Sequence, residues 1–340
     1  MSGVISAKIK RKIEELRSDY TRIAGKPFSH FYCPILFKDE DVPLCQAHIV
    51  NKAFAGSSKA WTVQCEDVDN FYGSNFEADF ELLQYPKSQS KTTADIFMDK
   101  ALHKKFDPKI LVEGIETGYF IAQRSVPQQF TPIEFEKDGQ SIIVGLKMAP
   151  DAVIAASEGE WELDVSKDIR IAALVSLIKA AHLTLFDVLG YRYVLSAAGE
   201  FVGRQILGEF YSQNSGKPKA NVLQNAVLFF REFANMVRPV LSSGFDFQGS
   251  ITDKMFLICW GSSGNAWAII VFIRTGTLLH AVMLPVYDRA DMVSTYIDFL
   301  RNQRDSISVA LCRYEQGQEH WKINKEPTRL EWPKTGVLYP

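Results

Sequence analysis

The residues of this chain whose types and spacing can carry out chemistry lie in positions 30–80. Two Cys-x-x-Cys pairs, about thirty residues apart, normally supply four thiolates to one structural zinc ion. Here each pair is half present, because Leu36 stands three residues after Cys33 and Val68 stands three residues after Cys65. Two thiolates make a poor zinc site. We therefore expect a degenerate zinc knuckle, in which packed apolar side chains have replaced the structural zinc.

The same segment resembles the HNH endonuclease superfamily, in its branch with zinc knuckles. The matching positions are Cys33, the run His48-Ile49-Val50-Asn51-Lys52-Ala53-Phe54, then Cys65 and the run Asp69-Asn70-Phe71-Tyr72-Gly73-Ser74. The resemblance covers residues 30–80 of the 340. It implies a small ββα domain derived from a treble clef.

In that family a β-hairpin packs on a helix around one divalent metal ion, and a His activates the water that attacks the phosphate. The resemblance implies that His48 is this general base, a role that suits an imidazole that is neutral near pH 7. It also implies that Asp69 binds Mg²⁺ or Mn²⁺, for which a carboxylate oxygen is a good ligand. The other ligand position holds Ala47, which cannot bind a metal. We therefore expect Asn70 to take part in catalysis and Glu77 to complete the metal site of a nuclease that hydrolyses DNA or RNA.

The departures from the family pattern favour an alternative function. With Ala47 and two apolar residues at ligand positions, the segment could be a catalytically inactive HNH-derived module that binds nucleic acid or a protein partner. Asp69 and Asn70 could serve only as caps of the following helix, since both residue types are favoured at that position. A site elsewhere, in residues 95–340, is a third alternative, although no residue pattern there indicates a chemistry.

Composition and charge limit the function classes. The formal net charge of −2 excludes a protein that is basic over its whole surface, so any contact with nucleic acid must be local. Residues 1–26 hold seven basic and three acidic residues, and the apolar spacing in 4–24 predicts an amphipathic helix with a phosphate-contacting or simply solvated face.

No apolar run is long enough for a membrane span, and we see no signal peptide. Five Cys residues, an odd number, favour free thiols and a cytoplasmic location without membrane contact.

The expected fold class is α+β. A basic amphipathic helix in residues 1–26 precedes the HNH-like ββα domain in 27–86, and a larger mixed-sheet α/β domain follows in 94–340. A protein partner or a second copy of the chain could bind through this larger domain. Its expected elements are helices in 94–126, a β-hairpin around Asp138-Gly139, a long buried helix in 169–190, helices in 198–213 and 221–238, three strands in 251–287, a helix in 289–303, a strand in 307–314 and an irregular tail from Trp321.

Overall fold

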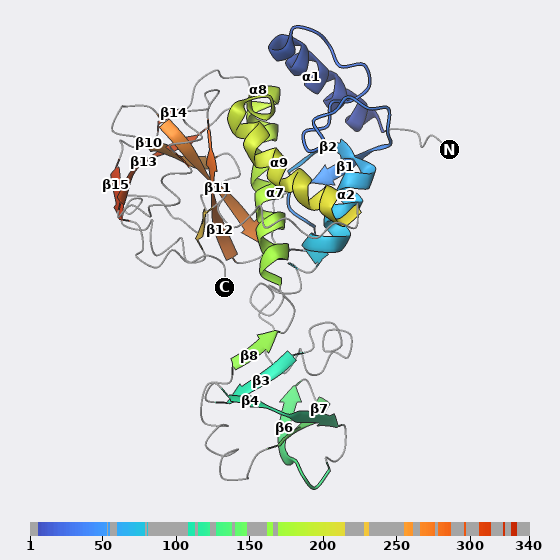
Figure 1. Ribbon diagram of the computed structural model, residues 1–340, viewed down its shortest axis with the longest axis vertical. Coiled ribbons are helices and arrows are strands. Elements are labelled where there is room, and N and C mark those ends of the chain that lie inside the picture. The colour runs from blue at the N-terminus through green and yellow to red at the C-terminus, as the bar shows by residue number, and fades with distance from the viewer. Residues whose placement is uncertain are drawn as a thin grey trace. The chain divides into compact units, whose positions relative to one another are not determined.

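The protein divides into two compact units in a computed structural model (Figure 1). The first unit joins Met1–Phe80 to Arg170–Pro340, and the second is Glu81–Ile169. One domain was predicted for 94–340, whereas in the structure the chain from Arg170 onward belongs to the same compact unit as the N-terminal residues. The structure describes residues 6–52, 54, 60–78, 80, 108–112, 115–122, 127–137, 140–147, 162–165, 169–214, 228–230, 255–260, 266–275, 278–286, 296, 306–313, 322–323 and 328–331.

The N-terminal helix is confirmed. Helix α1, Ala7–Ala24, begins after Ser6, whose side chain accepts a hydrogen bond from the backbone N–H of Ile9 at 3.3 Å. It ends at Gly25, which has φ 76° and donates its N–H to the carbonyl of Thr21. One face of the helix is buried, as the apolar spacing predicts, through Ile13, Leu16 and Tyr20.

A hairpin and a helix follow, and they position the candidate site. Strands β1, Leu44–His48, and β2, Trp61–Cys65, pair in antiparallel register. Helix α2, Glu66–Tyr72, starts directly after β2 and continues into a π-helical turn, η1, Gly73–Glu77. This order of two strands and a helix is the one expected from the sequence; its relation to the HNH fold stays a prediction.

Helix α7, Ile169–Leu189, confirms the long buried helix. Its described side chains from 175 to 186 are all buried, because apolar residues cover most of its circumference and the protein surrounds it. Two further helices follow, α8, Tyr191–Val194, and α9, Ala197–Asn214. Helices α7 and α9 lie between the large sheet and the β1–β2–α2 segment (Figure 1). The hydroxyl of Tyr72 in α2 donates a hydrogen bond to the carbonyl of Ile206 in α9.

The large sheet of the first unit is antiparallel in every pairing that the structure describes, and its order is β14-β13-β10-β11-β12-β9, with β15 also paired to β13. The three strands predicted in 251–287 and the strand at 307–314 are confirmed. The helix predicted in 221–238 is wrong where it is described, because residues 228–230 form a strand. The tail, expected to be irregular, contains two short strands. The strands are β9 Leu228–Phe230, β10 Met255–Trp260, β11 Ala266–Thr275, β12 Leu278–Pro285, β13 Ser306–Arg313, β14 Lys322–Ile323 and β15 Thr328–Glu331.

The second unit contains two small antiparallel sheets, β4-β3-β8 and β5-β7-β6. The hairpin around Asp138-Gly139 is confirmed, since Lys137 pairs with Gln140. The helices predicted in 94–126 are wrong where the chain is described, because short apolar runs there form strands, and such runs do not separate helix from strand by periodicity. The strands are β3 Pro108–Val112, β4 Ile115–Thr117, β5 Tyr119–Ala122, β6 Thr131–Lys137, β7 Gln140–Leu146 and β8 Glu162–Val165.

The α+β class is confirmed, because the described chain contains both helices and antiparallel strands. The mixed sheet is not found, since all described strand pairs are antiparallel. The helix predicted in 289–303 lies outside the described residues, apart from the helical residue Tyr296. Among the helices that the structure describes, none has the length and apolar character needed to cross a membrane.

Gly190 provides a test of how α1 and α7 are joined. It has φ 64°, and a Cβ placed on it would lie 2.0 Å from Oδ2 of Asp19, which accepts the backbone N–H of Tyr191 at 2.7 Å. We expect Gly190→Ala to lower the free energy of unfolding by about 2 kcal/mol, because Ala is strained in this conformation and displaces the carboxylate. Urea denaturation measures this loss.

Gly73 is the matched control for that substitution. Its φ is −57° in the helix, and no described atom lies within 4 Å of a Cβ placed on it. We expect Gly73→Ala to raise the free energy of unfolding by about 0.5–1 kcal/mol, since Ala is the better helix former. Equal effects of the two substitutions would contradict the role given to the conformation of Gly190.

Candidate functional site

The two faces of the β1–β2 hairpin carry different side chains. Residues directly opposite each other in an antiparallel pair share a face, and neighbours along a strand point to opposite faces. Ala47 pairs with Thr62, whereas His48 pairs with Trp61. Cys45 lies two residues before Ala47 and shares its face. The residue before the predicted base and the base itself therefore point to opposite faces of the hairpin.

Two lysines and one carboxylate act electrostatically on the imidazole of His48. Lys8 of α1 places its Nζ 4.3 Å from the ring centroid of Trp61, the residue opposite His48. Partial burial lowers the pKa of His48, and the positive charges of Lys52 and Lys8 lower it further, against the opposing effect of Asp69. The imidazole is therefore neutral at pH 7.

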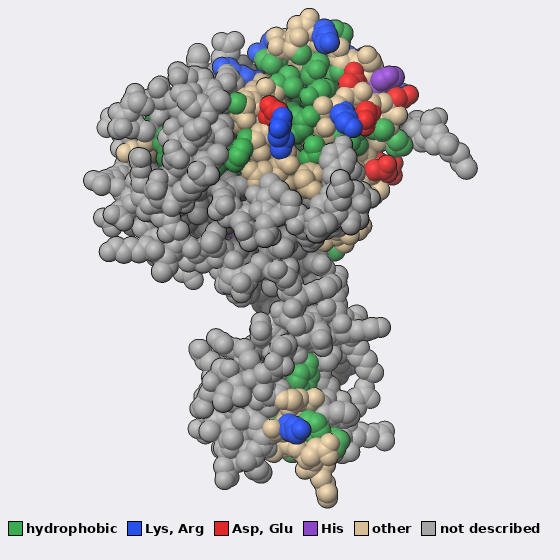
Figure 2. Space-filling view, viewed as in Figure 1, with side chains coloured by type: hydrophobic (Ala, Val, Ile, Leu, Met, Phe, Trp, Pro, Cys, Tyr) green, Lys and Arg blue, Asp and Glu red, His purple; other side chains and the backbone are tan. Residues whose placement is uncertain are grey.

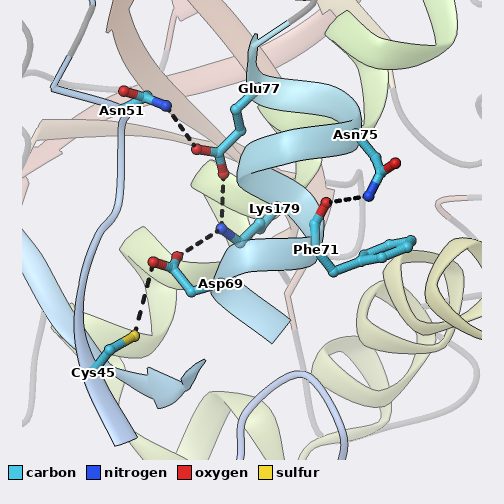
Figure 3. Close-up of polar contacts among 7 residues, drawn as sticks. All are labelled: Cys45, Asn51, Asp69, Phe71, Asn75, Glu77 and Lys179. Carbon is cyan, nitrogen blue, oxygen red and sulfur yellow. Dashed lines mark hydrogen bonds and ion pairs between the residues drawn. The ribbon is translucent and has the colours of Figure 1, made fainter. Parts of the chain in front are cut away.

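On the side of Cys45, two carboxylates converge on a buried ammonium (Figure 3). The Nζ of Lys179, from α7, lies 2.7 Å from Oε1 of Glu77 and 3.4 Å from Oδ1 of Asp69. The Lys179 side chain is 0% exposed, whereas those of Glu77 and Asp69 are 11% and 30% exposed. Burial acts to lower the pKa of Lys179, but the charges of Glu77 and Asp69 outweigh it and raise the pKa. Lys179 is therefore an ammonium ion.

Two further side chains complete this cluster. The amide of Asn51 donates to Oε2 of Glu77 at 3.4 Å, and the thiol of Cys45 donates to Oδ2 of Asp69 at 3.8 Å (Figure 3). Burial and the adjacent carboxylate of Asp69 raise the pKa of Cys45 to about 12, so this thiol stays protonated. Cys45 thus serves as a hydrogen-bond donor to Asp69.

The π-helical turn explains how Asp69 and Glu77 reach one ammonium. In an uninterrupted α-helix, side chains eight residues apart point in directions that differ by about 80°. The wider turn η1, between these two positions, changes that angle, and both carboxylates face Lys179. Such turns are common at functional sites, and this one gives the cluster its geometry.

The arrangement does not fit a divalent metal ion. The ammonium of Lys179 already lies between the two carboxylates that were predicted as ligands. Ala47, at the family's other ligand position, is fully buried. Over the described part of the chain, no three His, Cys, Asp or Glu side chains are grouped so that they could hold a metal. The structure therefore brings Asp69 and Glu77 together, while His48 lies on the other hairpin face and Asn70 is exposed to solvent.

Cys33 and Cys65, the two Cys residues of the predicted degenerate knuckle, are both buried. The backbone N–H of Leu36 donates to Sγ of Cys33 at 3.5 Å. Val68 is fully buried, whereas Leu36 is only partly buried, and the replacement of a structural zinc by packed side chains stays a prediction. His182 of α7 contacts the carbonyl of Pro34 in the same turn, with 3.0 Å between Nε2 and the oxygen.

Lys179 is the functional residue that the sequence analysis missed. It was read as part of a buried helix, IRIAALVSLIKAAHLTLFDVL, without a role of its own. A Lys on a helix that is apolar on most sides indicates a buried ion pair, because a buried ammonium requires a carboxylate partner. The partners themselves, Asp69 and Glu77, lie 110 and 102 residues earlier, where no local pattern connects them to Lys179.

No family model, no curated protein and no solved structure matched this chain. The resemblance of residues 30–80 to HNH endonucleases therefore stays a prediction, as do the cytoplasmic location and a partner bound through residues 94–340.

Proposed function

We propose that the N-terminal unit contains a catalytically inactive, HNH-derived module that binds nucleic acid through its phosphates. The observation that carries this proposal is the ammonium of Lys179 between Asp69 and Glu77. In an HNH nuclease the residue at the position of Asp69 holds a divalent cation, whose charge activates the water and stabilises the phosphate. An internal lysine balances the carboxylates but leaves no open coordination position for a substrate.

The binding surface is the positively charged hairpin face, the His48 surface, formed by Lys8, His48, Lys52 and Trp61. Lys8 and Lys52 lower the pKa of His48, which shows that their positive charges act on the imidazole. On the face of the molecule shown in Figure 2, the Lys and Arg side chains of the described residues are interspersed with Asp and Glu. The chain as a whole carries a net charge of −2, so phosphate binding requires a local concentration of positive charge. Lys8 and Lys52 supply that positive charge at the His48 surface.

Substitution of the two lysines tests this binding. We expect Lys8→Gln/Lys52→Gln to weaken binding to short DNA and RNA, and to reduce the salt dependence of log K by about one unit for each lost phosphate contact. Fluorescence anisotropy over a salt series measures both effects. The matched control is Arg204→Gln, which removes a cation from the exposed pair with Glu200 on α9. An equal loss in the control, or no binding by the wild type at low salt, would contradict the proposal.

Metal-dependent cleavage is the second candidate function. It is favoured by the neutral state of His48, since a neutral imidazole can act as a base. The same oligonucleotides, incubated with Mg²⁺ or Mn²⁺ in the binding experiment, separate the two functions. Binding without products supports the inactive module. Products that require both the metal and His48, tested with His48→Ala, would replace it with the nuclease.

A further inference from the structure

We infer that the His48 surface binds nucleic acid as a single strand, with one base stacked on the indole ring of Trp61. The inference rests on the proposed function and adds the form of nucleic acid that the surface takes. In a single strand the faces of the bases are free to stack on aromatic side chains, whereas in a duplex neighbouring base pairs cover them. An aromatic ring that takes a base therefore favours the single strand.

The register of the hairpin places His48 and Trp61 side by side. The two residues lie opposite each other in β1 and β2. The N–H of Ile49 donates to the carbonyl of Ala60 at 3.1 Å, so the next pair along the ladder is hydrogen-bonded. Hydrogen-bonded and non-hydrogen-bonded pairs alternate in an antiparallel ladder, so His48 and Trp61 form a non-hydrogen-bonded pair. Side chains lie closest together in such pairs, and the imidazole and the indole are therefore neighbours on one face.

An exposed side chain covers part of the Trp61 ring. The Nζ of Lys8 lies 4.3 Å from the ring centroid. Lys8 is exposed, and Trp61 and His48 are half-buried. The group over the ring is thus the charged end of a flexible side chain at the surface, which can leave the ring without disturbing the core.

The two contacts that compete for the ring differ in strength. A cation–π contact at an exposed site is worth about 2- to 5-fold in an equilibrium constant. A base stacked on an aromatic side chain is worth about 5- to 150-fold in affinity. A base therefore displaces the ammonium of Lys8 from the ring. The displaced ammonium then pairs with a phosphate of the same strand, so Trp61 and Lys8 act together on one segment of nucleic acid.

The position of α1 argues against a duplex on this surface. A two-stranded ribbon can enter the major groove of DNA and read base edges there. Here α1 lies against the hairpin, and Lys8 extends from it over the face that would have to enter the groove. The helix hinders the approach of two backbones at once, whereas one extended strand needs access to the ring and to the lysines alone.

An abasic strand is the matched probe for this inference, because it has the phosphates of a single strand without the bases. In fluorescence anisotropy with the full-length protein, we expect a short oligothymidine to bind about tenfold tighter than an abasic strand of the same length. An oligouridine should bind as the oligothymidine does, since the face of the base is common to DNA and RNA. The oligothymidine should also quench tryptophan fluorescence, whereas the abasic strand and a duplex should not.

Three variants assign these effects to Trp61, which is one of six Trp residues. Trp61→Leu should lower the affinity for the oligothymidine to that for the abasic strand and abolish the quenching. Trp61→Phe should retain more of the affinity than Trp61→Leu, because phenylalanine keeps an aromatic face. The control is Trp260→Phe in β10, which should keep both the preference for the oligothymidine and the quenching.

The possible failures are distinguishable. Equal affinity of the wild type for the oligothymidine and the abasic strand would overturn the inference and leave phosphate binding by the His48 surface in place. Quenching that persists in Trp61→Leu would also overturn it. A wild type that binds none of the probes at low salt would overturn both the inference and the proposed function. The comparison of oligothymidine with the abasic strand uses the wild type alone, so a variant that fails to fold does not affect it.

Discussion

We expect Lys179→Met to lower the free energy of unfolding by about 3–5 kcal/mol, the cost typical of removing one partner from a buried ion pair. Methionine fills a similar volume, so the loss comes from charge and not from a cavity. Asp69 and Glu77 would then face each other without the cation that now lies 3.4 Å and 2.7 Å from them. Urea denaturation, followed by tryptophan fluorescence, measures the loss.

Two further variants separate charge from packing. In Lys179→Met/Glu77→Gln one of the uncompensated carboxylates is also neutralised, and we expect part of the stability to return. Arg204→Met removes a cation of an exposed pair on α9 and should change stability far less, because solvent screens such pairs. If Lys179→Met were as stable as the wild type, the ammonium would not balance these carboxylates, and the proposal of an inactive module would lose its main support.

The second large effect that we expect is a loss of stability in mild acid, caused by His182. Its side chain is fully buried, and burial lowers its pKa to about 4, against the opposing effect of the hydrogen bond to Pro34. In the unfolded chain a His titrates near pH 6.5, so below that pH the unfolded state binds more protons than the folded state. The stabilisation is complete above pH 6.5 and is lost as the pH falls toward 4. Between pH 7 and pH 5 the loss is about 2 kcal/mol.

Denaturation midpoints at pH 7 and pH 5 measure this dependence. In His182→Gln the fall between the two pH values should be about 2 kcal/mol smaller than in the wild type, whatever its stability at pH 7. His30→Gln is the matched control, because the His30 side chain is 51% exposed, and its pH dependence should stay close to that of the wild type. An unchanged pH dependence in His182→Gln would show that another group titrates in this range.

Local sequence patterns predict the elements that are long or strongly periodic. Apolar periodicity and the Gly residues that separate segments depend only on neighbouring residues. These two signals predicted helix α1, helix α7 and the strands around 255–285. The strands in 108–122 and 228–230 were not predicted, because runs of three to five apolar residues take the conformation that their distant partners impose. Pairing partners of this kind are not visible in one sequence.

Asp69 and Glu77 were predicted as ligands of one divalent metal ion, and this role stays a prediction. In the structure both carboxylates lie beside the ammonium of Lys179. The contact with Lys179 was not anticipated, since it joins segments more than 100 residues apart. The π-helical turn was not anticipated either, because it has no simple sequence signature.

The contact between Glu77 and Lys179 also bears on how the chain accommodates its second unit. That unit, Glu81–Ile169, is an insertion: the chain leaves the first unit after Phe80 and re-enters it at Arg170. Glu77 precedes the exit by three residues, and Lys179 follows the re-entry by nine. The ion pair therefore lies between the two chain segments that flank the second unit. Because the entropic cost of closing a loop grows only slowly with its length, we expect changes in the length of the second unit to have little effect on the stability of the first.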